Sequence, residues 1–324
     1  MQSFSSDTRI AEWDPFMITV VGGAGKVGVT TGAMVLLRDL DDVMLIDIKP
    51  NAPQGEALDL NHMAAVLGIS RRAYGSNDYK DMAGSDVVIV TAGFPRKAGQ
   101  TREELLKVNA DVMKQVADNI KEYAPNSKVL VLTNPSDAMT YVMYKKLGFP
   151  RERVIGFSGL LDSPRLAYYA SVKLNISAAS IQPIVLGMHG ENMFPAPRLS
   201  TVGGVPLISL MSQKDIDEIV KQTVNAGADI IKLRGYSSNW APAAGLALMA
   251  EAVKKDQRKV YIVSAYLNGE YGYRDVIAEV PAVLGRNGIE KILELPLNEE
   301  EKKGLDKSIS AVRDLINALP PEYK

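Results

Sequence analysis

The sequence predicts an α/β protein in which a doubly wound parallel sheet is followed by a second domain of α+β character. Apolar strands and amphipathic helices alternate along the first half of the 324 residues, and this alternation stops near residue 157. A glycine-rich turn also joins the first strand to the first helix. Such alternation produces right-handed βαβ units. We therefore expect domains at 1–157 and 158–324, tightly joined and sharing one cleft.

Short β-branched apolar runs mark the strands of the first half, because strands of a parallel sheet are buried on both faces. Longer segments with helical spacing lie between these runs. The expected strands are 17–22, 43–47, 86–93, 128–135 and 153–158, and the expected helices are 26–40, 55–65, 103–122 and 137–146.

The second half lacks this regular alternation, which is why an α+β domain is expected there. In chain order we expect a helix at 163–174, strands at 180–187 and 197–202, a GGVP hairpin turn at 203–206, helices at 213–233 and 242–254, strands at 259–266 and 275–284, and an amphipathic helix at 298–318.

Composition excludes several kinds of chemistry. The chain has no cysteine, so disulfides and thiolate catalysis are ruled out. A formal net charge of −1 does not suggest a nucleic-acid or membrane surface. No clustered ligand spacing predicts a metal site. The first sixteen residues have neither a basic flank nor an apolar run, so they do not resemble a signal peptide, and we expect a cytoplasmic protein.

Glycines in the segment ITVVGGAGKVGVTTG form a dinucleotide-binding fingerprint. Gly23, Gly25 and Gly28 have GxGxxG spacing between a predicted strand and a predicted helix. Such glycines make a tight turn, let the backbone approach a pyrophosphate and let helix and strand pack closely. The helix N-terminus attracts the phosphates, so we expect a Rossmann fold. Gly22 also fits a GxxGxxG spacing, which leaves open which glycine makes the turn.

Asp47 ends the second predicted strand, nineteen residues after Gly28. An acid at this distance binds the ribose hydroxyls. Because it repels a 2′-phosphate, we expect NAD rather than NADP, although Lys49 could soften that preference. The expected cofactor-binding residues are Gly23, Gly25, Lys26, Val27, Gly28, Asp47, Ala92, Gly93, Asn109 and Asn134.

Four further segments carry groups suited to a 2-oxo diacid. Each carboxylate of such a substrate needs a planar, charged donor, which is arginine. The keto oxygen needs a positive group and a proton donor backed by an acid. The segments are TAGFPRKAGQTR at 91–102, TNPSD at 133–137, GLLDSPR at 159–165 and GMHGENMFP at 187–195, and they offer Arg96, Arg102, Asp162, Arg165 and His189.

In these segments the chain resembles the lactate/malate dehydrogenase family, and more closely its lactate-dehydrogenase-like malate dehydrogenase branch. AGFPRKAGQTR, TNP, LLDSPR and GMHGENMFPAPRLSTVGGVPL occur in the family's order and spacing, and the match runs from about residue 17 to about residue 318. The resemblance implies an NAD-dependent oxidoreductase acting on a CH–OH group. It also implies a homotetramer or a dimer.

The resemblance implies a role for each residue. His189 is the acid/base catalyst and Asp162 is its partner. Arg165 clamps the C1 carboxylate, and Arg102, on a loop that closes over the cleft, polarises the carbonyl. Asn134 contacts both the substrate and the nicotinamide.

Arg96 stands at the position that selects the substrate in this family. Malate enzymes have arginine there, for the distal carboxylate, whereas lactate enzymes typically have glutamine. Pairing a buried arginine with a methyl group would leave its charge uncompensated, at a cost of roughly 3–5 kcal/mol. We therefore expect reversible oxidation of (S)-malate to oxaloacetate, with a lactate or other 2-hydroxy-acid dehydrogenase as the alternative.

Some residues depart from the family pattern or match it weakly. Met188 replaces the more usual Gly or Glu before the histidine, and Ala98 replaces the usual proline of the loop. The segment GYSSNWAPAAG at 235–245 resembles the family's substrate-facing helix, which makes Ser237 and Ser238 weaker candidates.

Two other classes of function are alternatives: an NAD-dependent epimerase and a non-catalytic nucleotide sensor. The epimerase signature YxxxK occurs twice, at 141–145 and 169–173, but without the GxxxGxG turn of that family. The complete set Asp162, Arg165 and His189 argues against a sensor. His62, on a helix with apolar spacing, is expected to be structural.

Overall fold

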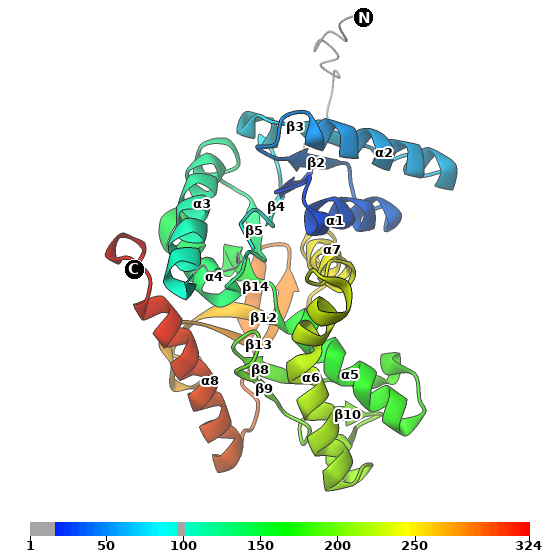
Figure 1. Ribbon diagram of the computed structural model, residues 1–324, viewed down its shortest axis with the longest axis vertical. Coiled ribbons are helices and arrows are strands. Elements are labelled where there is room, and N and C mark those ends of the chain that lie inside the picture. Colours follow the sequence, from blue (N-terminus) through cyan, green and yellow to red (C-terminus); the bar gives the residue numbers. More distant parts are fainter. Residues whose placement is uncertain (1–16, 96–100) are drawn as a thin grey trace, which may run out of the picture.

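The protein is known from a computed structural model that describes residues 17–95 and 101–324 (Figure 1). The side chain at position 102 also lies outside the description. Strands run through the middle of the molecule, with helices on both sides. This is the arrangement expected when apolar strands alternate with amphipathic helices.

The first half forms a parallel sheet in the order β3-β2-β1-β4-β5-β6. Its central strands are buried at every position, since helices cover both faces. The strands are β1 (Ile18–Val21), β2 (Val43–Ile46), β3 (Ala73–Ser76), β4 (Val87–Val90), β5 (Lys128–Val131) and β6 (Val154–Gly156), and the helices are α1 (Lys26–Leu37), α2 (Ala52–Leu67), α3 (Arg102–Tyr123) and α4 (Ser136–Leu147).

The sheet does not end at the predicted domain boundary. Gly156 of β6 pairs with Ser264 of an antiparallel strand from the second half, and the sheet continues in the order β12-β13-β8-β9. These strands are β12 (Lys259–Asn268), β13 (Arg274–Gly285), β8 (Val185–Gly187) and β9 (Met193–Pro195), with β14 (Gly288–Ile292) paired to β13. The boundary at 157 therefore stays a prediction.

The other elements of the second half surround this extension. The helices are α5 (Gly159–Leu174), α6 (Gln213–Arg234), α7 (Trp240–Lys254) and α8 (Glu299–Asn317), and the small sheet consists of β7 (Ile181–Gln182), β10 (Thr201–Val202) and β11 (Val205–Pro206). Helix α7 packs against α1 from the first half, and Figure 1 shows them on the side of the strands opposite α3 and α4. One apolar core runs from β1 to α8.

Several elements differ from the sequence-based prediction. Strands β3, β9 and β14 were not predicted. The strand expected at 180–187 is interrupted at Pro183, and its two parts, β7 and β8, belong to different sheets. Only the last two residues of 197–202 form a strand, because the Ala196 carbonyl accepts the N–H groups of Leu199 and Ser200 in a turn. The hairpin at 203–206 is confirmed, since Val202 pairs with Val205.

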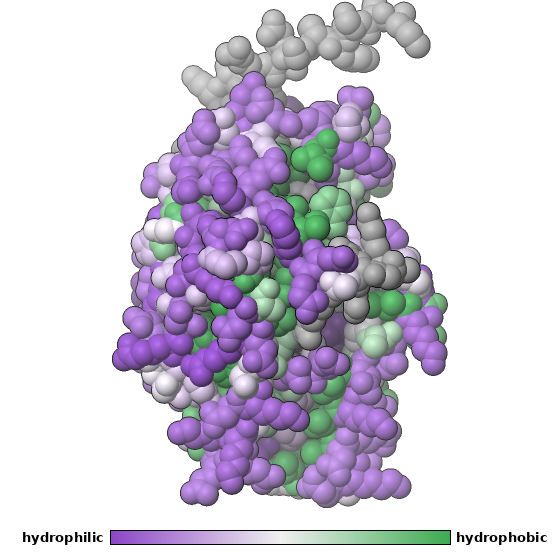
Figure 2. Space-filling view, turned by 60° about the vertical axis from the view of Figure 1, so that its left-hand side comes forward, coloured by the Kyte–Doolittle hydropathy of each residue, from purple (hydrophilic) through white to green (hydrophobic). Residues whose placement is uncertain are grey.

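The face shown in Figure 2 is mainly hydrophilic, with apolar side chains in seams between the polar ones. Among the described residues, no helix combines the length and apolar character needed to cross a bilayer.

Candidate active site

The glycine-rich turn packs so tightly that side chains are excluded from it. Gly22 directly follows β1 and has φ +84°, and its carbonyl accepts the Gly25 N–H at 3.0 Å. A Cβ at Gly28 would lie 2.2 Å from that same carbonyl oxygen, and a Cβ at Gly22 would lie 2.6 Å from the Ala92 nitrogen. The structure thus assigns the left-handed turn to Gly22, whereas Gly23 makes a close approach to Leu45.

Helix α1 begins directly after this turn with its N-terminus open. Gly25 provides no side-chain cap, and the first turn contains no acidic residue. The first N–H groups of a helix have no intrahelical partners and carry the positive end of the helix dipole. The end of α1 therefore fits a pyrophosphate, as the glycine spacing predicted.

Asp47 follows β2 and faces the glycine turn. One carboxylate oxygen accepts the Ala24 N–H at 3.1 Å and the other accepts the Lys49 N–H at 3.0 Å. A cavity of about 230 Å³ opens beside it, lined also by Gly22, Gly25, Ile48, Ala92, Gly93 and Phe94 among others. This cavity lies at the carboxyl ends of β1 and β2 and fits the ribose that Asp47 is expected to bind.

Asn109, expected to contact the cofactor, holds the ends of two neighbouring loops. Its buried side chain accepts the Phe94 N–H at 2.8 Å and donates to the Asn134 carbonyl at 2.7 Å. Thr133 adds a hydrogen bond to the Ala92 carbonyl at 2.6 Å. These contacts fix the backbone around Ala92 and Asn134, so Asn109 supports the cleft through its hydrogen bonds to backbone groups.

The side chains of two predicted arginines are not among those that the structure describes. Arg96 lies outside the described residues, and nothing is known of the Arg102 side chain. The backbone of Arg102 begins α3, which is fixed by a capping box: Thr101 accepts the Glu104 N–H at 3.1 Å, and Glu104 accepts the Thr101 N–H at 2.9 Å.

His189, Asp162 and Arg165 come together as predicted. His189 lies two residues beyond β8, while Asp162 and Arg165 lie in the first turns of α5. The His189 Nδ1 is 2.7 Å from one oxygen of Asp162, and the Arg165 Nη1 donates to the other at 2.9 Å. Asp162 is fully buried, and these two groups compensate its charge.

Two further acids, which the sequence-based prediction missed, lie beside this pair. Asp137, at the start of α4, accepts the backbone N–H of His189 at 2.9 Å. Glu279, on β13, has an oxygen 4.0 Å from the His189 Nδ1. Both are buried. Asp137 is the last residue of the segment TNPSD but was not named as a candidate there. Glu279 interrupts an apolar strand, which is the signal that could have identified it.

The buried acids influence protonation in this cluster. Burial opposes protonation of His189, but the charge and hydrogen bond of Asp162, aided by Asp137, outweigh it and raise the pKa of His189 above its ordinary value. Burial raises the pKa of Asp137 to about 6, against the hydrogen bond from His189. The net effect on His189 favours its imidazolium form.

A cavity of about 330 Å³ contains the described catalytic candidates. Asn134 and Val27 line it from the first half, and Arg165 and His189 from the second, so the predicted shared cleft is confirmed. The remaining lining residues include the weaker candidates Ser237 and Ser238 and an unpredicted face of α6, formed by Val224, Asn225, Gly227, Ala228 and Ile231. His62 is exposed on α2 and does not line the cavity.

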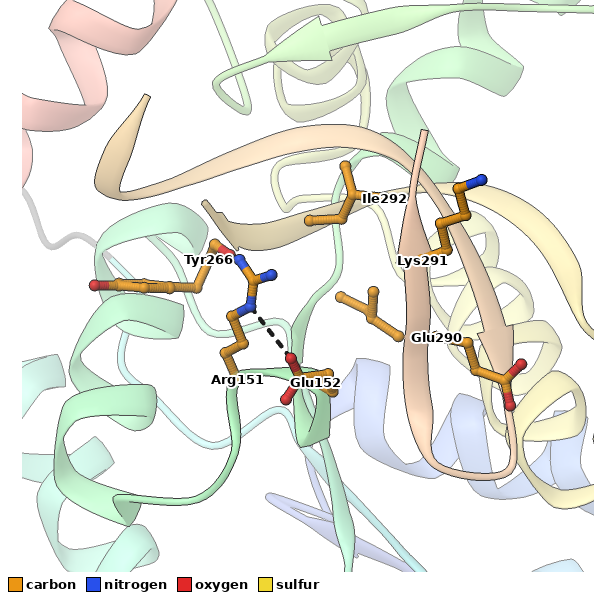
Figure 3. A pocket seen from close by; sticks show the side chains of 7 residues that line it. Arg151, Glu152, Tyr266, Glu290, Lys291 and Ile292 are labelled. Atoms are coloured by element: carbon orange, nitrogen blue, oxygen red, sulfur yellow. Dashed lines mark hydrogen bonds and ion pairs between the residues drawn. The ribbon is translucent and has the colours of Figure 1, made fainter. Parts of the chain in front are cut away.

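A second hollow, shown in Figure 3, is too small to bind a 2-oxo diacid. It has a volume of only about 50 Å³, which is room for a few waters. Its arginine, Arg151, already pairs with Glu152 at 3.2 Å and with Glu270 at 2.8 Å. The remaining lining residues are Tyr266, Ile289, Glu290, Lys291 and Ile292.

Comparison with known proteins agrees with this geometry. Sequence profiles for the lactate/malate dehydrogenase NAD binding domain and for the lactate/malate dehydrogenase alpha/beta C-terminal domain match residues 16–156 and 160–320. The chain therefore belongs to the lactate/malate dehydrogenase family and is an NAD-dependent oxidoreductase. The predicted fold class, family and cofactor are confirmed.

Individual relatives cover nearly the whole chain. A malate dehydrogenase from Aeropyrum pernix is 60% identical over 308 residues, which are 95% of this chain and 100% of the relative. Its solved structure has a TM-score of 0.91 and covers 95% of this chain and 99% of that one. A lactate dehydrogenase from Eimeria maxima, solved with NADH and oxamate, is 38% identical with a TM-score of 0.91 and 95% coverage of both chains.

Proposed function

We propose that this protein is a malate dehydrogenase that interconverts (S)-malate and oxaloacetate. The observation that carries the proposal is the His189 imidazole, backed at Nδ1 by the buried Asp162, in a cavity that also contains Arg165. The close relatives named malate dehydrogenase support the choice of substrate. When bound, the nicotinamide cofactor would supply the hydride to C2 of the substrate as NADH or accept it as NAD⁺.

The protein's own contribution to the reaction is proton transfer. With Nδ1 held by Asp162, the other ring nitrogen of His189, Nε2, is the one that can serve the substrate. In oxaloacetate reduction the imidazolium gives its Nε2 proton to the C2 oxygen, leaving neutral His189. In malate oxidation neutral His189 takes the hydroxyl proton, and Asp162 remains ionised and stabilises the imidazolium.

Arginines orient the two ends of the diacid in this proposal. Arg165 lines the cavity and gives only Nη1 to Asp162, so other guanidinium N–H groups can bind the C1 carboxylate. Arg96 binds the distal carboxylate and Arg102 polarises the carbonyl. For these two the support is the family resemblance.

The cofactor site fits NAD through groups of the first half. The open N-terminus of α1 binds the pyrophosphate. When NAD binds, the Asp47 carboxylate accepts hydrogen bonds from the ribose hydroxyls in place of those from the Ala24 and Lys49 N–H groups. The same negative charge repels the 2′-phosphate of NADP. In this proposal residues 1–157 bind the dinucleotide and residues 158–324 supply the catalytic pair.

One panel of rates tests the proposal. Purified protein is assayed with NADH or NADPH against oxaloacetate, pyruvate and 2-oxoglutarate. We expect the highest kcat/KM for oxaloacetate with NADH. Faster turnover of pyruvate would favour the alternative, a lactate dehydrogenase, and no NADH consumption with any of them would contradict the proposal.

We also propose a homotetramer, or a dimer, located in the cytoplasm. Large apolar side chains are exposed on α2, where Leu58, Val66 and Leu67 are 58%, 85% and 54% exposed. Two more are exposed at the end of α6 and the start of α7, where Leu233 and Trp240 are 86% and 64% exposed. Exposed apolar patches favour association. Light scattering tests the oligomer, and cell fractionation tests the location.

A further inference from the structure

Three buried carboxyl groups surround His189, and they outnumber the cations that the described residues place beside them. Asp137, Asp162 and Glu279 come from α4, α5 and β13, and each is at most 1% exposed. Within the described part of the chain, Arg165 and protonated His189 provide two positive charges to this cluster. Because like charges in a buried cluster cannot all ionise, at least one carboxyl retains its proton when His189 is neutral.

Hydrogen-bond donors distinguish the three carboxyls. Asp162 receives bonds from Arg165 at 2.9 Å and from the ring of His189 at 2.7 Å. Asp137 receives the backbone N–H of His189 at 2.9 Å and the hydroxyl of Ser264 at 3.2 Å. Each of these two carboxylates therefore has donors for both oxygens, as a buried anion requires.

Glu279 differs from both of these acids. Both of its carboxyl oxygens are buried without a hydrogen-bond partner among the described residues. The Ser158 hydroxyl faces Glu279, but the Ser264 hydroxyl donates to Asp137 at 3.2 Å, so the Ser158 hydroxyl donates to the Ser264 oxygen at 2.7 Å. Its other polar neighbours are His189, 4.0 Å away, and the carboxylate of Asp162. A carboxyl among acceptors is satisfied only if it carries its own proton and donates it.

A metal ion between these groups is the competing explanation. Single ligand atoms of Asp162, His189 and Glu279 lie within 4.8 Å of one another. However, the Asp162 oxygen and the His189 Nδ1 are 2.7 Å apart, whereas two ligands of one tetrahedral zinc ion stand about 3.3 Å apart. A proton fits the shorter distance and a metal does not.

We propose that Glu279 is a positioning residue that remains a neutral carboxylic acid and donates its proton in a hydrogen bond to Asp162. This inference rests on the proposed function, since it concerns the same catalytic pair. By withdrawing charge from Asp162, Glu279 limits how strongly the imidazolium is held. His189 then can both give and take a proton within one catalytic cycle.

Electrostatics supports this placement of the proton. Burial raises the pKa of Glu279 well above its ordinary value, and the charges of Asp162 and Asp137 act in the same direction. Arg165 and His189, the cationic side chains near Glu279, both hydrogen-bond to Asp162. The charge that they carry is therefore directed at Asp162 and not at Glu279.

Histidine NMR tests the proposal without cofactor or substrate. The chain has two histidines, so the titration of His189 can be followed beside the exposed His62 as an internal control. Glu279→Gln keeps a neutral donor, and Glu279→Met has similar volume without a donor. We expect the pKa of His189 to be unchanged in the Gln variant and raised by about half a unit to one unit in the Met variant. Loss of an ionised Glu279 would instead lower it in both.

A measurement on the unmodified chain covers the case in which a variant fails to fold. In protein labelled with ¹³C at glutamate side-chain carboxyls, we expect one signal to remain at the protonated position at pH 7. Glutamate signals that are all ionised at pH 7, or any other pattern in the histidine titration, overturn the proposal. Neither readout depends on turnover, so a failed malate assay and a failed inference are distinguishable.

Discussion

At the scale of single residues, the site is organised around one buried carboxylate. Asp162 binds Arg165 with one oxygen and His189 with the other. It thereby fixes the ring tautomer, raises the pKa of the imidazole and orients the guanidinium towards the cavity. A single residue thus links the proton donor to the group proposed to hold the substrate.

The raised pKa of His189 sets opposite pH dependences for the two directions. Oxaloacetate reduction needs the imidazolium, so its kcat/KM should stay level below the raised pKa and fall as pH rises through it. Malate oxidation needs the neutral ring and should rise over the same interval. Steady-state rates across pH check this, and Asp162→Asn should shift both limbs to lower pH. Rates of oxaloacetate reduction and malate oxidation that both rise, or both fall, across this pH interval would contradict the assignment.

Arg96 determines the preference between diacid and monoacid in this account. Arg96→Gln removes the charge expected to bind the distal carboxylate. We expect the ratio of kcat/KM for oxaloacetate to that for pyruvate to fall by about two orders of magnitude, which corresponds to about 3 kcal/mol. Lys49→Gln, in the cofactor half, is the control and should leave that ratio unchanged. An unaltered ratio in the Arg96 variant would exclude the role given to it.

At the scale of elements, the start of α1 depends on the absence of side chains. Gly28→Ala would place a Cβ 2.2 Å from the Gly22 carbonyl oxygen, so the turn must shift. We expect a loss of about 1–3 kcal/mol in the free energy of unfolding and weaker NADH binding. Denaturation and fluorescence titration measure the two effects.

Gly55→Ala is the matched control for that substitution. Gly55 lies within α2, and nothing stands within 4 Å of a Cβ there. Alanine should therefore stabilise the protein by about 1 kcal/mol and leave NADH binding unchanged. Equal behaviour of the two variants would refute the packing argument.

Buried, uniformly apolar elements were predictable from sequence, and elements with mixed patterns were not. β1, β2 and β4 are apolar at nearly every position because both faces are covered. β3 contains Gly75, where an added Cβ would lie 2.1 Å from the Pro53 carbonyl oxygen. The strand therefore needs a glycine at this position and lacks the continuous apolar run that would have predicted it. β14 is polar at Glu290 and Lys291 and pairs only with β13.

At the scale of the whole molecule, the two halves are joined by structure as well as by sequence. The sheet crosses from β6 to β12, α7 packs on α1, and the Arg38 Nε donates to Glu251 at 2.8 Å. The cleft is lined from both sides. The motifs predicted His189, Asp162 and Arg165, but only the fold brings Asp137 and Glu279 to them across large separations in sequence.

This continuity predicts cooperative unfolding. In a Trp13→Phe variant, Trp240 on α7 is the remaining tryptophan. Its fluorescence and the far-UV circular dichroism should change together in one denaturation transition, because one core spans both halves. Two separate transitions would show that the halves are stable independently.

The most direct test of the account is the loss of the imidazole itself. In His189→Asn, we expect the turnover of oxaloacetate with NADH at pH 7 to fall by about 10²–10⁴-fold, with an unchanged far-UV spectrum. His62→Asn, which removes the exposed histidine of α2, should retain full activity. Retention of wild-type turnover by the His189 variant would contradict the proposed chemistry at its centre.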